Sequence, residues 1–157
     1  MDSINSPAVL DGARVLAYAI IDKSVVYSER GSFFVDGKLL GPVPRLAICE
    51  YIDDTAILVF HCDNDCNSLG AQGTHTSVRA AKLTMEESYR GLMDKWVDTS
   101  VTEAGARAFF EKEFADEKCS FCGRWPIYVE KMIGNTVRIC NICIEEYYKL
   151  IKTDNQA

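Results

Sequence analysis

The sequence predicts an α+β fold, in which an antiparallel sheet carries helices packed on one face and a small zinc module follows at the C-terminal end. Two observations lead to this prediction. Strand-like segments precede helix-like segments, which is the order typical of α+β domains, and two Cys-x-x-Cys pairs lie close to the C-terminus. We divide the chain into four parts: a loose N-terminal arm (1–12), an α+β domain (13–117), a zinc module (118–152) and a tail (153–157).

The first strands are predicted from apolar runs bounded by turn residues. Residues 1–12 are small and polar and contain a proline and a glycine, so we expect a loose arm. Residues 14–21 are an apolar run short enough to be a buried strand or a helical turn. Asp36-Gly37 separates two apolar arms, 32–35 and 38–40. Because Asp-Gly tolerates the positive φ angles of a type I′ turn, this segment predicts a hairpin.

A second hairpin is predicted from residues 45–52 and 55–62. Both segments are rich in β-branched and aromatic residues, and Asp53-Asp54 lies between them where the chain must reverse. Residues 63–76 are polar and contain glycines, so we expect a loop there.

Two helices are predicted after this loop. Ser77 is the expected N-cap of the first helix, whose apolar stripe has a spacing of three and four residues: Val78, Ala81, Met85, Tyr89, Leu92 and Trp96. Gly91 lies inside this pattern and is expected to break or bend it. Ser100-Val-Thr-Glu103 matches a capping box. The helix that it opens is expected to turn these side chains toward a core: Ala104, Ala108, Phe109, Phe110 and Phe114.

Composition limits the function classes. The chain has 157 residues, a net charge of −6 and seven cysteines. It contains no apolar run long enough for a membrane helix and no signal-peptide pattern at its start, so we expect a cytoplasmic, bacterial-type protein. A reducing compartment favours metal ligands over disulfides. Residues 1–117 carry eleven Lys and Arg against nineteen Asp and Glu, which disfavours nucleic-acid binding.

Cys119 and Cys122, then Cys140 and Cys143, predict one structural zinc ion. Two cysteines three residues apart can direct both sulfurs at one point, and two such pairs complete a tetrahedron. Four thiolates close the zinc shell, which makes the site structural and not catalytic. Lys118, Arg124 and Arg138 lie beside the ligands in sequence and are expected to offset the negative charge of the centre.

The same region resembles a known family. The segments Cys119-Ser-Phe-Cys-Gly123, Val129-Glu-Lys-Met-Ile-Gly134 and Val137-Arg-Ile-Cys-Asn-Ile-Cys-Ile144 resemble the N-terminal C4-type zinc-binding domain of the ClpX unfoldase. The resemblance implies a treble-clef-like fold, with a helix at the second segment and then a strand that leads to the second cysteine pair at the start of a closing helix. It also implies dimerisation and binding of adaptor or substrate proteins. The sequence has no G-x-x-x-x-G-K-[ST] motif, so nucleotide binding and ATP-driven unfolding are not expected.

His61, Cys62, Cys66 and His75 form a possible second cluster. A metal site is one interpretation, but strand alternation sends His61 and Cys62 to opposite faces. The other interpretation is that Cys62 is a core thiol and His61 a surface imidazole, or the reverse. A hydrolase centred on Cys66 and His75 is a further alternative, although nearby carboxylates raise a thiol pKa and work against activation. We therefore expect a protein that is not an enzyme.

The expected function is protein–protein interaction, as an adaptor or regulator. The zinc module has more large apolar side chains than its small interior can hold, which indicates an interface, either with the N-terminal domain or with a second copy. We expect a protein partner and a homodimer. The candidate contact residues are Trp125, Tyr128, Tyr147, Tyr148 and Ile151. The alternative is an acidic toxin-immunity protein, which neutralises a basic enzyme through charge complementarity. No nucleic acid, membrane or nucleotide partner is expected.

Overall fold

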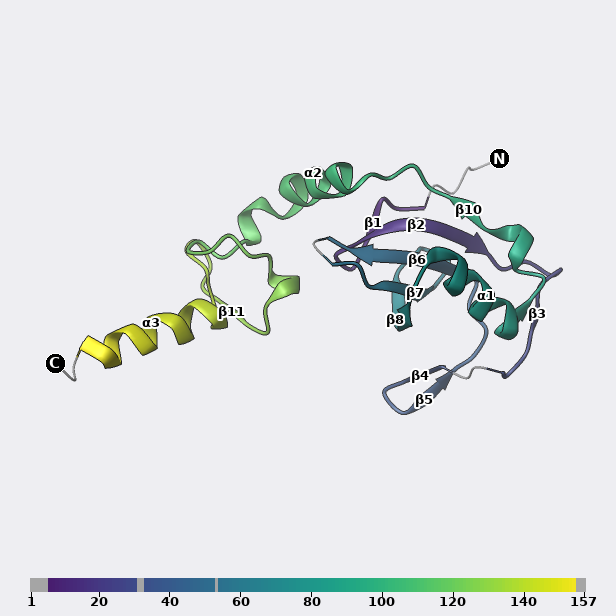
Figure 1. Cartoon of the computed structure of the whole chain (residues 1–157), viewed down its shortest axis with the longest axis horizontal. Coiled ribbons are helices and arrows are strands. Elements are labelled where there is room, and N and C mark those ends of the chain that lie inside the picture. Colours follow the sequence, from purple (N-terminus) through teal and green to yellow (C-terminus); the bar gives the residue numbers. More distant parts are fainter. Residues whose placement is uncertain (1–5, 31–32, 53, 155–157) are drawn as a thin grey trace. The chain divides into compact units, whose positions relative to one another are not determined.

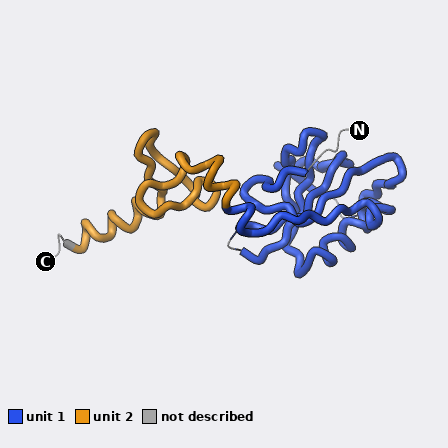
Figure 2. The backbone as a smooth tube through the Cα atoms, turned by 90° about the horizontal axis from the view of Figure 1, so that it is seen from above, with its two compact units in different colours: residues 1–107 blue, residues 108–157 orange. Residues whose placement is uncertain are grey.

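The computed structural model describes residues 6–30, 33–52 and 54–154, which fall into two compact units. Unit 1 comprises residues 1–107 and unit 2 residues 108–157 (Figure 2). The boundary expected at residue 118 lies within unit 2, so the segment before the first cysteine belongs to the same unit as the cysteines. Within the described residues, no helix combines the length and apolar character that crossing a membrane requires.

Unit 1 is built on a curled antiparallel sheet (Figure 1). Its strands follow the order β1 (Val9–Leu10), β2 (Ala13–Ile20), β6 (Arg45–Tyr51), β7 (Ile57–Cys62) and β8 (Ser68–His75), and β10 (Val97–Asp98) also pairs with β2. The expected α+β class is confirmed. Because alternate residues of β2 are buried, the apolar run at its position is a strand and not a helical turn.

The start of the chain differs from the expected loose arm. Val9 and Leu10 pair with Arg14 and Ala13, so the end of this segment is a strand of the sheet. The reversal between them is made by Asp11 and a following glycine, both at positive φ. This tight turn folds the chain back, so that β1 can form backbone hydrogen bonds with β2. The polar composition of the segment does not indicate this pairing.

The β6–β7 hairpin is confirmed, with Arg45 opposite Cys62 and Glu50 opposite Ile57. Asp53, half of the expected turn, lies outside the described residues. The expected loop 63–76 is wrong over most of its length, because Ser68–His75 form β8. This strand is rich in glycine and polar residues and has low strand propensity. It forms because β7 offers a row of backbone hydrogen-bonding groups at its free side.

A second hairpin joins β4 (Phe33–Val35) to β5 (Lys38–Leu40). Asp36 and Gly37 have φ angles of 50° and 75°, as a type I′ turn requires, so this prediction is confirmed for the described residues. Residue 32 of the expected first arm lies outside them. The Phe33 ring stacks on the imidazole of His61 at a centroid distance of 4.5 Å, which places the hairpin against β7.

Helix α1 (Val78–Ser88) covers one face of the sheet. The backbone N–H of Ala80 donates to Ser77 Oγ at 3.0 Å, which confirms the predicted cap. The helix ends well before Trp96, because Gly91 has a φ of 90° and β9 (Tyr89–Arg90) pairs with β3 (Val26–Tyr27). A 3-10 turn, η1 (Met93–Lys95), follows. The predicted stripe nevertheless faces the core, since Ala81, Met85, Tyr89 and Leu92 are all buried.

Both faces of the sheet carry buried apolar side chains. On the α1 face, residues of three strands pack with the helix: Ala17, Ala19, Leu46, Ile48 and Val59. The other face has its own cluster: Leu10, Ala13, Val15, Ala47, Cys49, Phe60 and Cys62. β2 contributes to both clusters because it has a bulge between Val15 and Ala17. Its buried side chains before the bulge lie in the second cluster, and those after it lie in the first. Unit 1 therefore has a core made from its own residues.

Helix α2 (Glu103–Phe114) begins two residues later than the capping-box prediction requires. Its cap is Thr102, whose Oγ1 accepts from the backbone N–H of Gly105 at 3.0 Å, and not Ser100. Ala104, Ala108 and Phe109 were expected to face a core but are exposed. Phe110 is buried as predicted, because its ring packs on that of Trp125, and Phe114 is half-buried. Ala106, which the prediction omits, is also buried.

The rest of unit 2 consists of short elements and one helix: η2 (Ala115–Glu117), η3 (Pro126–Tyr128), β11 (Met132–Ile133), β12 (Ile139–Cys140) and α3 (Asn141–Asp154). The helix implied at residues 129–134 is absent from the described structure, since a strand occupies its end. Gly134 turns the β11–β12 hairpin at a φ of 106°, where a Cβ would lie 2.0 Å from the carbonyl oxygen of Val137. The order of knuckle, hairpin and helix is treble-clef-like.

Candidate metal centre

The four predicted ligands converge in unit 2. Cys119 and Cys122 lie on the knuckle that follows η2, Cys140 ends β12, and Cys143 lies in the first turn of α3. Their four Sγ atoms lie within 4.8 Å of one another. The Cys119–Cys143 and Cys122–Cys140 sulfur pairs are 3.9 and 3.6 Å apart. A regular tetrahedron with Zn–S bonds of about 2.3 Å has sulfurs about 3.8 Å apart, so the arrangement fits a structural Zn²⁺.

The knuckle is shaped by backbone hydrogen bonds around the first cysteine. The N–H of Cys119 donates to the carbonyl of Arg124 at 2.9 Å, and the N–H of Gly123 donates to the carbonyl of Cys119 at 2.9 Å. Gly123 has a φ of 73°, which glycine adopts without strain. This tight turn is what lets two cysteines three residues apart direct their sulfurs at one point.

The knuckle is tied to the strand that carries the second cysteine pair. The Ser120 N–H donates to the Arg138 carbonyl at 2.7 Å, and the Arg138 N–H donates to Ser120 Oγ at 3.0 Å. The Cys140 N–H points at Cys119 Sγ at 3.4 Å. These bonds join the two halves of the site through the backbone, so the ligand positions are set by the fold.

Hydrogen bonding distinguishes the thiols from one another. Burial raises the pKa of Cys119, but backbone N–H groups of Cys122, Phe121 and Cys140 outweigh burial and lower this pKa to about 6. At Cys122 the effect of burial is likewise exceeded, chiefly by the N–H of Arg124, so its pKa is lowered. Burial and the neighbouring cysteines raise the pKa of Cys143. A bound Zn²⁺ deprotonates coordinating thiols outright.

Of the three cations expected near the ligands, Arg124 contacts one. Its guanidinium bonds the sulfur of Cys122, which raises the pKa of Arg124. Lys118 instead pairs with the carboxylate of Glu111 and lies 4.6 Å from the centre of the Trp125 ring. Arg138 donates from Nε to the carbonyl of Asn135 at 3.1 Å. Of the three cations, Arg124 is therefore the one with a described contact to a ligand sulfur.

Trp125 belongs to the core of unit 2, which corrects its expected place on a contact surface. It is only 6% exposed. Its ring lies 5.2 Å from that of Phe110 and 6.0 Å from that of Tyr128. The physical reason is that α2 continues into unit 2 and presents Phe110 to this ring. Tyr128 is half-buried beside it.

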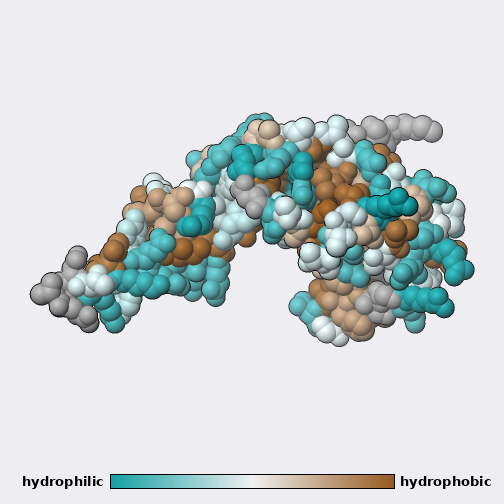
Figure 3. Space-filling model, viewed as in Figure 1, coloured by the Kyte–Doolittle hydropathy of each residue, from teal (hydrophilic) through white to brown (hydrophobic). Residues whose placement is uncertain are grey.

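The other three expected contact residues are exposed on α3, at 44% for Tyr147, 57% for Tyr148 and 62% for Ile151. Ile144, 38% exposed, lies one turn earlier. Sequence reasoning missed Phe121 of the knuckle, which is 53% exposed and whose ring lies 5.7 Å from that of Tyr147. We call these five residues the α3 stripe. Figure 3 shows hydrophobic surface on this helix beside hydrophilic surface.

The cluster of His61, Cys62, Cys66 and His75 does not assemble. His61 stacks on Phe33, whereas Cys62 lies in the core of the opposite face, as strand alternation predicts. Cys66 precedes β8 and His75 ends it, and a strand of that length spans about 24 Å. His61 is buried and not at the surface. In the part of the chain that the structure describes, the four zinc-module cysteines are the one group positioned to hold a metal.

Comparison with known proteins agrees with this geometry over one part of the chain. No curated protein and no solved structure matches the chain at the level of similarity that indicates a relative. Residues 117–153, with all four cysteines, match the family model of the ClpX C4-type zinc finger.

Proposed function

We propose that this protein is a non-enzymatic interaction protein, an adaptor or regulator, in which the zinc module presents the α3 stripe to a second copy of the chain. The observation that carries the proposal is the exposure of five large apolar side chains on one small unit. Contiguous exposed apolar surface on a soluble protein is typical of an interaction site. Aromatic residues suit such a site because they bury large areas at small entropic loss.

The spacing of the stripe favours a helical partner. Ile144, Tyr147, Tyr148 and Ile151 follow the i, i+3, i+4, i+7 pattern of one helix face. Such a face packs along another helix with the same pattern. The zinc shell supports this function because it holds Phe121 of the knuckle against Tyr147 and so fixes the start of the stripe.

The charges of α3 favour a second copy in antiparallel orientation. Glu145 and Glu146 lie in the first half of the helix, and Lys149 and Lys152 lie in the second half. In a pair with twofold symmetry, the acidic half of one helix faces the basic half of its partner. Lys152 Nζ already lies 4.8 Å from the centre of the Tyr148 ring, at the edge of the stripe.

The test compares Ile151→Glu with Val137→Glu by sedimentation equilibrium of the zinc-loaded chain. Both residues are apolar and 62% exposed, but Val137 lies in the β11–β12 hairpin and outside the stripe. Ile151→Glu is expected to raise the dimer dissociation constant at least tenfold, and Val137→Glu to leave it unchanged. Both variants should retain one zinc per chain. A monomeric wild-type chain at high concentration, or equal effects of both substitutions, would contradict the proposal.

Two further features support a binding role over the other functions considered. Four thiolates leave zinc no position for substrate, and the thiol of Cys66 lies far along β8 from His75. Neutralisation of a basic toxin through the acidic residues of unit 1 predicts binding that weakens steeply with salt. Association through the α3 stripe rests mainly on apolar contacts, so salt is expected to weaken it less steeply, by screening the Glu and Lys pairs alone, and a salt series distinguishes the two.

A further inference from the structure

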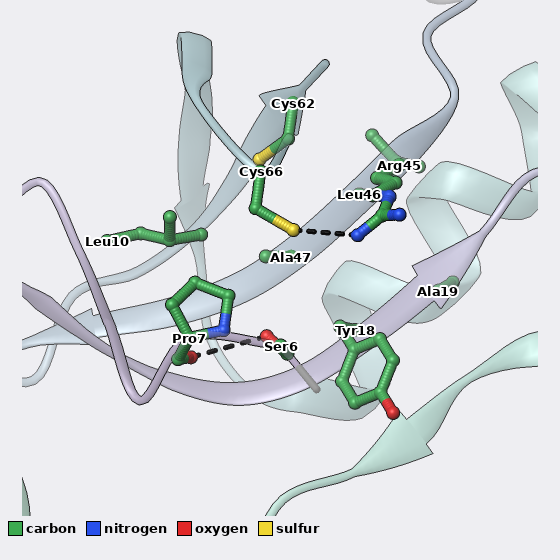
Figure 4. A pocket seen from close by; sticks show the side chains of 10 residues that line it. All are labelled: Ser6, Pro7, Leu10, Tyr18, Ala19, Arg45, Leu46, Ala47, Cys62 and Cys66. Atoms are coloured by element: carbon green, nitrogen blue, oxygen red, sulfur yellow. Dashed lines mark hydrogen bonds between the residues drawn. The ribbon is translucent and has the colours of Figure 1, made fainter. Parts of the chain in front are cut away.

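A small cavity beside the end of β7 brings together groups that the proposed function does not use (Figure 4). Its volume is about 10 Å³. Two thiols, Cys62 and Cys66, and the guanidinium of Arg45 line it with mainly apolar neighbours such as Leu10 and Ala47. A space of this size holds about one water-sized molecule. The cavity therefore excludes large ligands and admits very small ones.

Arg45 and Cys66 are in direct contact. Arg45 Nη1 donates to Cys66 Sγ at 2.9 Å, the bond drawn as a dashed line in Figure 4. The guanidinium therefore puts a positive charge directly beside the sulfur of Cys66. The nearby carboxylate of Asp63 makes its hydrogen bonds within its own loop. It accepts hydrogen bonds from the backbone N–H groups of Asp65 and Asn67 and from Asn67 Nδ2.

The backbone holds Cys66 in an unusual conformation. Its φ is 64°, in the left-handed region that glycine or asparagine adopts at lower energy. The turn that imposes this conformation is closed by the Cys66 N–H, which donates to the Asp63 carbonyl at 3.2 Å. The result is that the thiol lies in the cavity beside Arg45, and strained residues of this kind concentrate at functional sites.

The two other cysteines of unit 1 are buried thiols. Cys62 is 2% exposed, and burial raises its pKa to about 12. Cys49 is fully buried, and burial raises its pKa well above the ordinary value. Cys66 is partly exposed, and its sulfur accepts a hydrogen bond from the guanidinium of Arg45. Among these three thiols, the combination of access, a cation and a neighbouring thiol occurs at Cys66.

We propose that Cys66 is a site of reversible oxidation by hydrogen peroxide, with Cys62 as the thiol that resolves the oxidised form. The Cys66 thiolate attacks one peroxide oxygen, the O–O bond breaks, and hydroxide leaves as the sulfur becomes sulfenic acid. The Cys62 sulfur then attacks the Cys66 sulfur while the proton of the Cys62 thiol passes to the departing hydroxyl group, so the S–O bond breaks, a disulfide forms and water is released. Two electrons pass from the thiols to the peroxide, and a cellular dithiol reductant reverses the reaction.

The test treats the zinc-loaded full chain with equimolar hydrogen peroxide and digests it with a protease that cleaves before aspartate. Cleavage at Asp63 and Asp65 puts Cys62 and Cys66 on separate peptides. In the wild type, mass spectrometry is expected to find these two peptides joined by a disulfide. In Cys62→Ser, the sulfenic acid persists and dimedone labels Cys66. Arg45→Gln is expected to slow the oxidation at least tenfold, and Arg45→Lys to retain most of the rate.

Two internal controls keep the test decisive. Cys49 should stay unlabelled, and a chromogenic chelator should detect no zinc release until Cys66 has reacted. Thermal unfolding checks that each Arg45 variant is folded. The proposal is overturned if Cys49 reacts as fast as Cys66, if Arg45→Gln leaves the rate unchanged, or if the zinc thiolates oxidise first.

Discussion

Removal of one zinc ligand should unfold unit 2 and leave unit 1 intact. Cys140 is fully buried in the centre of the site, and its N–H points at Cys119 Sγ. In Cys140→Ser the tetrahedron loses one thiolate. The matched control is Cys66→Ser, which removes a thiol of unit 1 that is not a ligand.

The magnitude follows from what else holds unit 2 together. Structural zinc contributes about 10–16 kcal/mol to the folding of small modules. Apart from the cysteines, the buried large side chains described in unit 2 are Phe110 and Trp125. Full burial of two such rings contributes about 5 kcal/mol. Because this is well below the zinc contribution, the aromatic pair cannot keep the module folded once the metal is lost.

Each unit has its own tryptophan, so the two responses can be measured separately. Trp96 packs at the edge of the unit 1 core, and Trp125 lies in unit 2. In Cys140→Ser, limited proteolysis should cut within residues 108–154 and spare residues before 107. Fluorescence of Trp125, measured in a Trp96→Phe background, should shift to the red. An unchanged protease pattern after ligand substitution or chelation would refute the structural role of the metal.

Three further predictions concern single residues. Gly134→Ala should destabilise unit 2 by more than 1 kcal/mol in chelator titrations, because the added Cβ would clash with the Val137 carbonyl. Gly123→Ala is the control: its Cβ would have open space, so this substitution should destabilise unit 2 by about 1 kcal/mol, through its positive φ alone. Trp125→Ala should cost about 3–5 kcal/mol and weaken zinc retention. Burial lowers the pKa of His61 in folded unit 1, so at mildly acidic pH this imidazole binds a proton more readily in the unfolded chain than in the folded one. The unfolding free energy of unit 1 should therefore fall as pH drops below about 6.5, by up to about 1.4 kcal/mol per pH unit, and His61→Gln should flatten this dependence in urea titrations.

The features that the sequence predicted well are encoded within a few residues. A type I′ turn needs only Asp36-Gly37, a cap needs Ser77, and a zinc knuckle needs two cysteines and a glycine. The four metal ligands were predictable for the same reason, because each pair is local and the chemistry of zinc dictates how pairs combine.

The features that were missed depend on partners far away in sequence. β8 has low strand propensity and forms because β7 lies beside it. The inward side of α2 is set by contacts such as that of Phe110 with Trp125, which lies fifteen residues further along the chain. The contact of Arg45 with Cys66 joins residues 21 positions apart, which no local pattern indicates.

The burial of Trp125 shows how one such missed contact changes the interpretation of the whole module. As a surface residue it would have extended the proposed interface, but its ring packs on Phe110 of α2. The last turns of α2 are then part of unit 2 and not of the α+β domain, where the sequence predicts them. This agrees with the start of unit 2 at residue 108, ten residues before the module boundary that the sequence predicts. It also divides the aromatic residues into two groups: Trp125 and Phe110 pack inside the unit, whereas the aromatic residues of the α3 stripe are exposed and form part of the interface that we propose.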